Sequence, residues 1–327
     1  TPQIALVGCG YWGKNLCRNF YALGALSAVV DVTENGHEAA RSIAPNVRVT
    51  KSFVNILEDD QIHGVALATP AETHADFAIQ AMQAGKDVFV EKPMALTLED
   101  AEKMKKVADK KGRILMVGHL LEYHPAVLKL REMIASGELG KINYIYSNRL
   151  NFGKVRTEEN ALWSFAPHDF AVILRLMGQA PLEVSACGGS YLTNGIADTT
   201  MSNLRFSDES RAHIFVSWLH PFKEQRLVVV GDKKMAIFND VDPFGEKLQL
   251  YPQNVEFDGP IPILKKEDAE FVEHADTEPL REECKHFLEC IRTRNSPLTD
   301  SQSGIEVLKV LHACQNSIQQ NGIPVRL

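Results

Sequence analysis

The sequence predicts an α/β protein in which an N-terminal doubly wound parallel sheet is followed by a second α/β domain built on antiparallel strands. Short apolar runs alternate with helical patterns over the first 118 residues, and they lie at 3–8, 27–32, 64–69, 87–92 and 113–118. Strands that are apolar on both faces suit a parallel sheet covered by helices. Later β-rich runs alternate residue by residue, which is typical of an antiparallel sheet with one covered face.

Length and composition bound the class of protein. The chain has 327 residues, of which 45% are hydrophobic and 24% charged, so we expect about two globular domains. A formal net charge of -7 argues against general nucleic-acid binding. No apolar stretch reaches the roughly 18 residues of a membrane span, and the cysteines form no C-x-x-C pair. We therefore expect a cytoplasmic protein with no metal site.

Three glycines follow the first apolar run. Gly8, Gly10 and Gly13 have the G-x-G-x-x-G spacing, and a helical pattern begins at Lys14. Glycine at these positions allows a tight turn and lets a pyrophosphate approach backbone N–H groups at a helix N-terminus. Asp31 ends the second run, near the roughly 20-residue offset of the acid that binds the adenosine ribose hydroxyls. The motif predicts a dinucleotide site, and the carboxylate favours NAD because it repels the 2′-phosphate of NADP.

Two further polar groups follow later strands at their carboxyl ends, where open α/β sheets bind ligands. Thr69 and Pro70 follow the third run, and His74 begins the next helical pattern. Glu91 and Lys92 follow the fourth run. Such charges are often only solvated, and a histidine at a helix start is often a surface residue. Here the sheet topology directs these side chains toward the cofactor crevice.

These residues resemble the glucose–fructose oxidoreductase, inositol dehydrogenase and rhizopine catabolism family. The resemblance covers nearly the whole chain and includes the three glycines, Thr69-Pro70 with His74, the triplet Glu91-Lys92-Pro93 and the segment 124–142. It implies a Rossmann domain, then an α/β domain whose open, mostly antiparallel sheet mediates a homodimer or homotetramer. The family's E-K-P lysine contacts the substrate hydroxyl beside the nicotinamide, so the resemblance makes Lys92 catalytic. The residues assigned to NAD are Gly8, Gly10, Tyr11, Trp12, Gly13, Asp31, Thr69, Pro70, His74, Glu91 and Lys92.

The predicted domain boundary follows the fifth apolar run. Residues 1–119 form the NAD-binding domain, and residues 120–327 form the substrate-binding and oligomerisation domain. The strands of the second domain are expected at 141–150, 199–206, 211–219, 226–231 and 247–251. We interpret the proline-rich, charged stretch 252–271 as an irregular surface excursion. The last helix, at 304–319, is expected to pack back on the first domain, as the family implies.

A histidine in the second domain is the other candidate for proton transfer. After His168, an apolar stripe continues through Phe170, Ile173 and Leu174, so the histidine is expected at a helix start, facing a cavity. The family usually has D-x-x-x-H-x-x-D here, and His168 aligns with its histidine. Ser164 stands where the aspartate is usual, so an aspartate-assisted base is in doubt. Lys92 and His168 are left to share the proton chemistry, in an order that the sequence leaves open.

Basic residues lead directly to His168 in an otherwise acidic chain. Arg149, Lys154 and Arg156 favour an anionic substrate. The segment is similar to a subgroup that oxidises C3 of UDP-linked N-acetylamino sugars, such as UDP-N-acetylglucosamine, to 3-keto sugars. Trp163 is either a stacking residue for the sugar or uracil or a packing aromatic. The residues assigned to the substrate are Tyr123, Arg149, Lys154, Arg156, Asn160, Trp163, Ser164, His168 and Asp169.

Two other functions stay open at this stage. A free polyol or sugar dehydrogenase of the inositol type needs no phosphate-binding arginines. A non-catalytic sensor that uses NAD is the second alternative. The presence of both Lys92 and His168 argues against a sensor, because binding alone requires neither side chain.

Overall fold

The computed structural model describes residues 1–153, 155–252, 254–265 and 267–327, which divide into two compact units. The first unit contains residues 1–123 and 277–308, and the second contains residues 124–276 and 309–327. Residues 277–308 thus belong with the first unit, whereas the division expected from the sequence placed them in the second domain. The first unit also extends four residues beyond 119, to Tyr123.

The first unit contains a parallel sheet with the strand order β3-β2-β1-β4-β5-β6. This is the Rossmann order: successive strands are added toward one edge of the sheet from β1 to β3 and toward the other edge from β4 to β6, so the order switches between β1 and β4. The predicted doubly wound sheet is confirmed, but β3 was missed because it is short and has only one apolar residue, Val49. The strands are β1 Ile4–Val7, β2 Leu26–Val30, β3 Arg48–Thr50, β4 Gly64–Leu67, β5 Asp87–Glu91 and β6 Leu115–Gly118.

Helices cover both faces of this sheet. Among them, α1 packs against α2 and α8, and α4 packs against α5. Local signals fix their ends: the Thr97 side chain caps the start of α5, and Gly112 ends it in the left-handed conformation. The helices of the first unit are α1 Gly13–Ala22, α2 Glu34–Ile43, α3 Val54–Leu57, α4 His74–Gln83, α5 Leu98–Lys111 and α8 Pro279–Thr293, with the 3₁₀ turns η1 Ala71–Thr73 and η2 Leu120–Tyr123.

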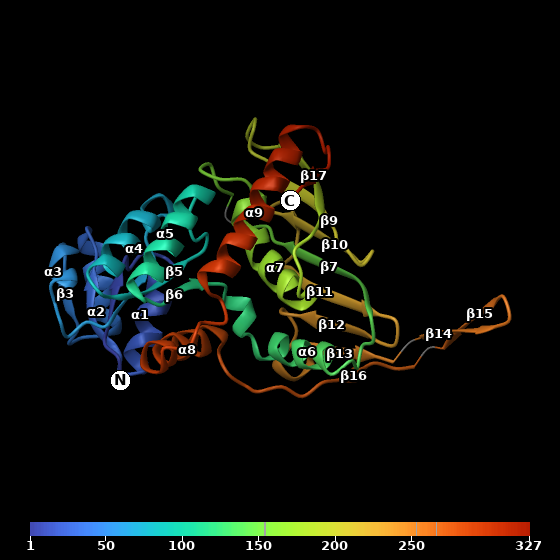
Figure 1. Ribbon diagram of the computed structural model, residues 1–327, viewed down its shortest axis with the longest axis horizontal. Helices are drawn as coiled ribbons and strands as arrows, with labels where there is room; N and C mark the ends of the chain where they lie inside the picture. The colour runs from blue at the N-terminus through green and yellow to red at the C-terminus, as the bar shows by residue number, and fades with distance from the viewer. Residues whose placement is uncertain (154, 253, 266) are drawn as a thin grey trace. The chain divides into compact units, whose positions relative to one another are not determined.

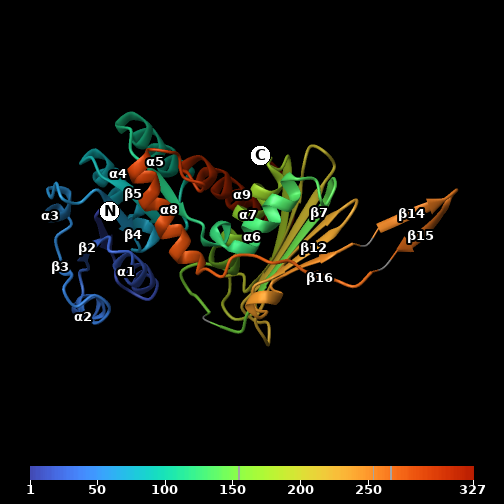
Figure 2. The same ribbon diagram turned by 90° about the horizontal axis from the view of Figure 1, so that it is seen from below.

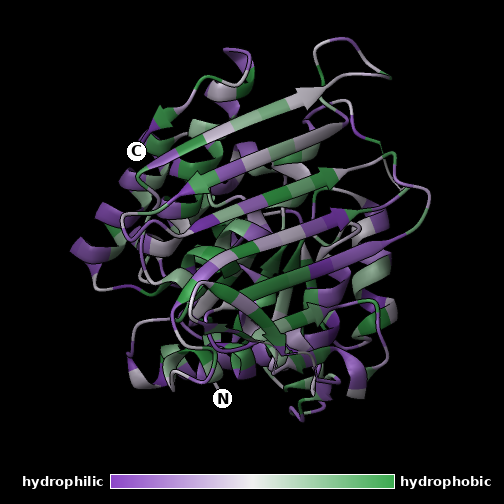
Figure 3. Cartoon of the chain, turned by 90° about the vertical axis from the view of Figure 1, so that its right-hand side faces the viewer, coloured by the Kyte–Doolittle hydropathy of each residue, from purple (hydrophilic) through white to green (hydrophobic). Residues whose placement is uncertain are grey.

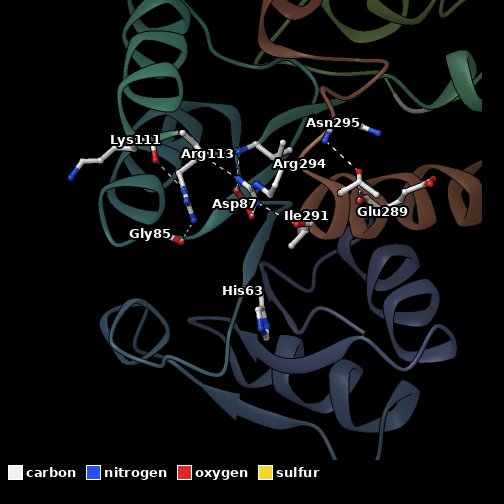
Figure 4. Close-up of polar contacts among 12 residues, drawn as sticks. His63, Gly85, Asp87, Lys111, Arg113, Glu289, Ile291, Arg294 and Asn295 are labelled. Carbon is white, nitrogen blue, oxygen red and sulfur yellow. Dashed lines mark hydrogen bonds and ion pairs between the residues drawn. The ribbon is translucent and has the colours of Figure 1, made fainter.

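An ion pair fastens the end of α8 to the start of β5 (Figure 4). Arg294, the C-cap residue of α8, donates from Nη1 and Nη2 to the carboxylate of Asp87 at 2.6 and 2.9 Å. Its Nη2 also donates to the Gly112 carbonyl at 2.9 Å. Asp87 is 2% exposed and accepts from the Ile114 N–H at 2.8 Å. One guanidinium therefore connects α8, β5 and the end of α5, in addition to the burial of the apolar face of α8 in the core of this unit.

The second unit contains a mixed sheet with the strand order β16-β13-β12-β11-β7-β10-β9-β8-β17. Its neighbours are antiparallel apart from the parallel pair β7 and β10, so the predicted mostly antiparallel sheet is confirmed. Helices α6 and α7 pack on one face (Figure 2). Hydrophilic and hydrophobic residues both occur along its strands (Figure 3). The strands are β7 Ile142–Leu150, β8 Glu183–Gly189, β9 Thr199–Arg205, β10 Arg211–Ser217, β11 Glu224–Gly231, β12 Met235–Asn239, β13 Leu248–Tyr251, β16 Glu270–Phe271 and β17 Val325–Arg326.

The helices of the second unit are α6 Pro125–Ala135 and α7 Ala161–Met177, with the 3₁₀ turn η3 Phe244–Glu246. Helix α9, Ser301–Gln319, contributes its residues through Leu308 to the first unit and those from Lys309 onward to the second. Gly304 lies against Val117 and Met94 of the first unit. Ser317 bonds the backbone of Ala186 in the second unit. Among the described residues, no helix is long and apolar enough to cross a membrane.

A separate hairpin interrupts the sheet of the second unit. Strands β14 Asn254–Asp258 and β15 Ile261–Lys265 pair with each other and extend away from the larger sheet (Figure 1). The stretch expected to be irregular is therefore partly a β-hairpin. Its exposed large apolar residues are Val255, Phe257, Ile261, Ile263 and Leu264.

Candidate cofactor and substrate sites

The glycine loop joins β1 to α1 in the way that the sequence predicts. Gly8 has φ +89°, and a Cβ there would lie 2.7 Å from the Ala68 carbonyl oxygen. A Cβ on Gly13 would lie 2.1 Å from the Gly8 carbonyl oxygen, whereas a Cβ on Gly10 would meet no atom within 4 Å. Within the part of the chain that the structure describes, no side chain caps the first turn of α1. The loop is thus closely packed beneath Gly8 and Gly13 and open at Gly10, beside backbone N–H groups that suit an anion.

Asp31 follows β2 and lies next to this loop. Its Oδ2 accepts from the Cys9 N–H at 2.8 Å, and its Oδ1 accepts from the Thr33 N–H and hydroxyl at 2.8 and 2.7 Å. Burial raises the pKa of Asp31, whereas these hydrogen bonds lower it. Together the hydrogen bonds have the larger effect, so the pKa of Asp31 lies below its usual value. Gly36 of α2 leaves room for the carboxylate, since a Cβ there would lie 2.1 Å from its Cγ. Asp31 is therefore a fixed, ionised acceptor at the end of β2.

The end of β5 connects to the glycine loop through one side chain. The Trp12 indole N–H donates to Glu91 Oε1 at 2.5 Å, and the Lys92 N–H donates to Glu91 Oε2 at 3.3 Å. The Glu91 side chain packs against Gly118, where a Cβ would lie 2.9 Å from Oε2. Burial raises the pKa of Glu91 to about 7, against the lowering influence of Trp12 and Lys92. The structure therefore brings together Trp12, Glu91 and the backbone of Lys92, whose peptide bond to Pro93 is cis.

His74 is a buried residue that connects two loops, and its predicted contact with the cofactor stays a prediction. It is 1% exposed, and its Nδ1 and Nε2 lie 2.9 Å from the carbonyl oxygens of Pro93 and Thr69. Burial lowers the pKa of His74, against the raising influence of those two carbonyls. The histidine links the loop after β4 to the loop after β5, so it positions both Thr69-Pro70 and the residues following Lys92.

The histidine of the second unit lies inside α7, which corrects the prediction that it begins a helix. The helix starts at Ala161, where Asn160 accepts from the Trp163 N–H at 3.2 Å as a side-chain cap. His168 is half-buried in the second turn, directly after Pro167. Ser164 is buried in the first turn, and its N–H donates to the Asn160 carbonyl at 3.1 Å. Sequence reasoning placed the start too late because it began the helix at the apolar stripe after His168 and did not recognise Asn160 as the cap.

Arg149 and Asp169 contact each other, although both were predicted to contact the substrate. Arg149 is 8% exposed and Asp169 is 3% exposed. Arg149 Nε donates to Asp169 Oδ2 at 2.7 Å, and Nη2 donates to Oδ1 at 3.3 Å. Ser147 also donates to Oδ1, at 2.5 Å. The buried pair joins β7 to α7, so Arg149 is not a solvent-facing clamp for phosphate.

Other residues assigned to the substrate also have partners within the second unit. Arg156 lies 3.7 Å from a Glu158 carboxylate oxygen and 3.2 Å from one of Glu159. The Asn160 amide and the Trp163 indole N–H both donate to Gln315 Oε1, at 2.8 and 3.2 Å. Lys154 lies outside the described residues. Gln315 had no sequence signal, because its partners precede it by about 150 residues.

Tyr123, which was assigned to the substrate, is part of the core of the first unit, and its contact with substrate stays a prediction. It is 4% exposed, and its hydroxyl lies 2.9 Å from Thr299 Oγ1. Burial, followed by the charge of Glu283, raises its pKa. Glu283 of α8 is itself 0% exposed, and burial together with the nearby Glu91 and Glu122 raises its pKa. Sequence reasoning missed Glu283, although an acid three residues after Leu280 lies on the apolar helical face.

Family models identify both halves of the chain. The NAD-binding Rossmann domain of the GFO/IDH/MocA oxidoreductase family matches residues 3–119, and the C-terminal domain of the same family matches residues 127–237. The chain belongs to this family. Its cofactor is NAD, and the family resemblance inferred from the motifs is confirmed.

Relatives within the GFO/IDH/MocA family have several activities. UDP-N-acetylglucosamine 3-dehydrogenase of Acidithiobacillus ferrooxidans is 27% identical over 94% of both chains. The scyllo-inositol 2-dehydrogenase (NAD(+)) of Bacillus subtilis is 26% identical over 99% of this chain and 96% of its own. A 2,7-anhydro-N-acetylneuraminate hydratase of Mediterraneibacter gnavus is 29% identical over 76% of this chain and 70% of its own. A solved structure of the Acidithiobacillus enzyme has the same fold, with a TM-score of 0.86 over 97% of both chains at 24% identity.

The first unit of this GFO/IDH/MocA protein has the features that NAD requires. Gly10 leaves open space at the N-terminus of α1, which suits the pyrophosphate. Asp31 retains its charge at the end of β2, where Rossmann domains place the acid that binds the ribose hydroxyls. Among the described residues, no group of three or more His, Cys, Asp or Glu side chains is arranged to hold a metal ion.

Proposed function

We propose that this protein oxidises a secondary hydroxyl of a sugar or polyol, with Lys92 and His168 as its catalytic residues. The position of Lys92 carries the proposal. It directly follows the carboxyl end of β5, and its backbone N–H is bonded to Glu91, which Trp12 connects to the glycine loop. Ligands of open parallel sheets bind at this edge. Two relatives that match nearly the whole chain are sugar or inositol dehydrogenases, which supports the same reaction class.

Oxidation of a secondary alcohol requires removal of a hydride from carbon and of a proton from oxygen. When bound, NAD supplies the hydride acceptor. In our proposal the neutral amine of Lys92 hydrogen-bonds the substrate hydroxyl and accepts its proton, which converts the amine to an ammonium group. His168 provides the second group of this exchange, either as the base or as the partner that orients Lys92. Ser164 at the usual aspartate position leaves these two side chains without the family's acid.

We propose a UDP-linked N-acetylamino sugar oxidised at C3 as the first substrate to test. A relative with this activity aligns with 94% of the chain. The second candidate is a free polyol, and a specific observation favours it. Arg149 and Arg156 each contact carboxylates, and therefore the charge pattern that suggested an anionic substrate is largely compensated within the protein. The domain roles, a homodimer or homotetramer and a cytoplasmic location remain predictions.

The decisive experiment measures NAD reduction by the unmodified protein with UDP-N-acetylglucosamine and with myo-inositol. Lys92→Met should slow the hydride step by roughly 100-fold or more, the scale of a positioned acid–base group, while NAD affinity stays within about threefold. Lys103→Met on the exposed face of α5 is the matched control and should behave like the unmodified protein. Near-normal turnover in Lys92→Met would remove Lys92 from the chemistry. Oxidation of myo-inositol but not of the nucleotide sugar would select the polyol function.

A further inference from the structure

Asp169 directly follows His168 in α7 and forms a buried ion pair with Arg149 of β7. We propose that Arg149 and Asp169 are positioning residues that hold the His168 turn of α7 against β7. Successive helical residues point about 100° apart, so Asp169 faces the sheet while the His168 side chain leaves the helix in a different direction. The inference rests on the proposed role of His168 and assigns a function to two residues that do not themselves contact the reacting atoms.

The geometry of the pair is specific to arginine. Its fork places Nε at 2.7 Å and Nη2 at 3.3 Å from the two oxygens of the Asp169 carboxylate. Ser147, two residues before Arg149 on the same face of β7, adds a hydrogen bond of 2.5 Å. Three donors from one strand therefore fix both the position and the rotation of the carboxylate. A lysine would provide the charge but not the planar fork.

Further polar side chains continue this contact across the sheet. When the Gln225 amide is oriented to satisfy its neighbours, its oxygen accepts from Arg149 Nη1 and its nitrogen donates to Asp240 Oδ2, both at 3.1 Å. Asp240 Oδ1 lies 3.5 Å from His124 Nε2 and 3.0 Å from Lys247 Nζ. His124 caps α6 by accepting from the Ala126 N–H at its Nδ1, which leaves the proton on Nε2 for Asp240. The network thus runs from α7 through β7 and β11 to the start of α6.

Burial makes the contact between Arg149 and Asp169 rigid. A charge removed from water is tolerated only when it is paired and hydrogen-bonded, so neither Arg149 nor Asp169 is expected to leave its partner during turnover. Ser147 is 1% exposed, which excludes water from the same contact. The pair therefore provides a fixed base for the turn that carries His168, as a catalytic side chain requires from its supporting residues.

The test compares Arg149→Lys with Arg205→Lys, which alters a partly exposed arginine–glutamate pair on β9 and β8. If Arg149 positions His168, Arg149→Lys should lower kcat roughly tenfold or more with either substrate and leave KM and NAD affinity within about threefold. Arg205→Lys should change none of these values. A rise in KM for the nucleotide sugar alone, with kcat intact, would instead make Arg149 a phosphate ligand and overturn the proposal. So would unchanged kcat in a folded variant.

A second measurement does not depend on activity. The imidazole ¹⁵N resonances of His168, assigned by their loss in His168→Asn, should shift in Arg149→Lys and not in Arg205→Lys. Identical His168 resonances in Arg149→Lys and the unmodified protein would refute the positioning role even if the substrate were neither a sugar nor a polyol. If Arg149→Lys does not fold, the double variant Arg149→Met/Asp169→Leu replaces both charges by apolar groups. Its kcat and its His168 resonances are then compared with those of the unmodified protein in place of those of Arg149→Lys.

Discussion

The buried carboxyl group of Glu91 should make the stability of the protein depend on pH. Its pKa is raised from 4.5 to about 7 by burial, although the Trp12 hydrogen bond and the charge of Lys92 oppose this shift. The folded state therefore holds the Glu91 proton more tightly than the unfolded chain does. Its stabilising contribution is fully present below pH 4.5 and is lost as the pH rises through about 7. A difference of about 2.5 units corresponds to about 3 kcal/mol of unfolding free energy.

Glu91→Gln tests this reasoning because an amide stays neutral and still offers an oxygen to the Trp12 indole. We expect the variant to gain about 3 kcal/mol relative to the unmodified protein between pH 4.5 and pH 8, measured by urea unfolding of the NAD-free protein. Glu283 is present in both proteins, so its own raised pKa largely cancels in the difference. Glu99→Gln, on the exposed start of α5, is the control and should run parallel to the unmodified protein. Parallel curves for Glu91→Gln and the unmodified protein would show that folding does not raise the pKa of Glu91.

Two other predictions follow from fixed side chains of the first unit. Asp31→Ala should relax a preference for NAD over NADP, measured by calorimetric titration; equal binding of both cofactors to the unmodified protein would contradict this assignment. Arg294→Met should lower the unfolding free energy by about 1–3 kcal/mol, because it removes the guanidinium that pairs with the buried Asp87 carboxylate. The effect is smaller than for a fully buried pair, since Arg294 is 42% exposed. Arg48→Met, which breaks an exposed pair with Asp59, should lower the unfolding free energy much less than Arg294→Met does, and equal losses in the two variants would argue against the role of burial.

The parts of the cofactor site that sequence reasoning located share one property. Gly8 and Asp31 directly follow short apolar strands, and Gly13 begins the helix after the first of these strands. The topology of a parallel sheet brings the carboxyl ends of its strands together without further information. Partners from distant strands were not predictable in the same way. Trp12 and Glu91 were both assigned to the cofactor, but their mutual hydrogen bond depends on the packing of β5 against the glycine loop.

The second unit was harder to interpret because its patterns are ambiguous. Along β7, Ile142 and Ile145 lie on opposite faces, so apolar alternation does not show which face of the strand is covered. The buried face carries Ile145, Ser147 and Arg149, and a buried arginine reverses the usual expectation that a charge marks the solvent side. The hairpin at 254–265 was missed for a related reason, because charges and prolines hid its alternating apolar residues.

The pairing of Arg149 changes what the basic segment implies about substrate recognition. A charge-assisted hydrogen bond to a phosphate contributes about 1.5–3 kcal/mol. To make it, Arg149 would have to release Asp169, and leaving one partner of a buried pair uncompensated costs about 3–5 kcal/mol. Exchanging Asp169 for a phosphate would therefore cost more free energy than it returns, and only the largest gain set against the smallest cost would make the exchange neutral. If a nucleotide sugar is the substrate, its diphosphate must therefore be bound by groups other than Arg149, and the contribution of Arg149 to catalysis lies in the position of α7.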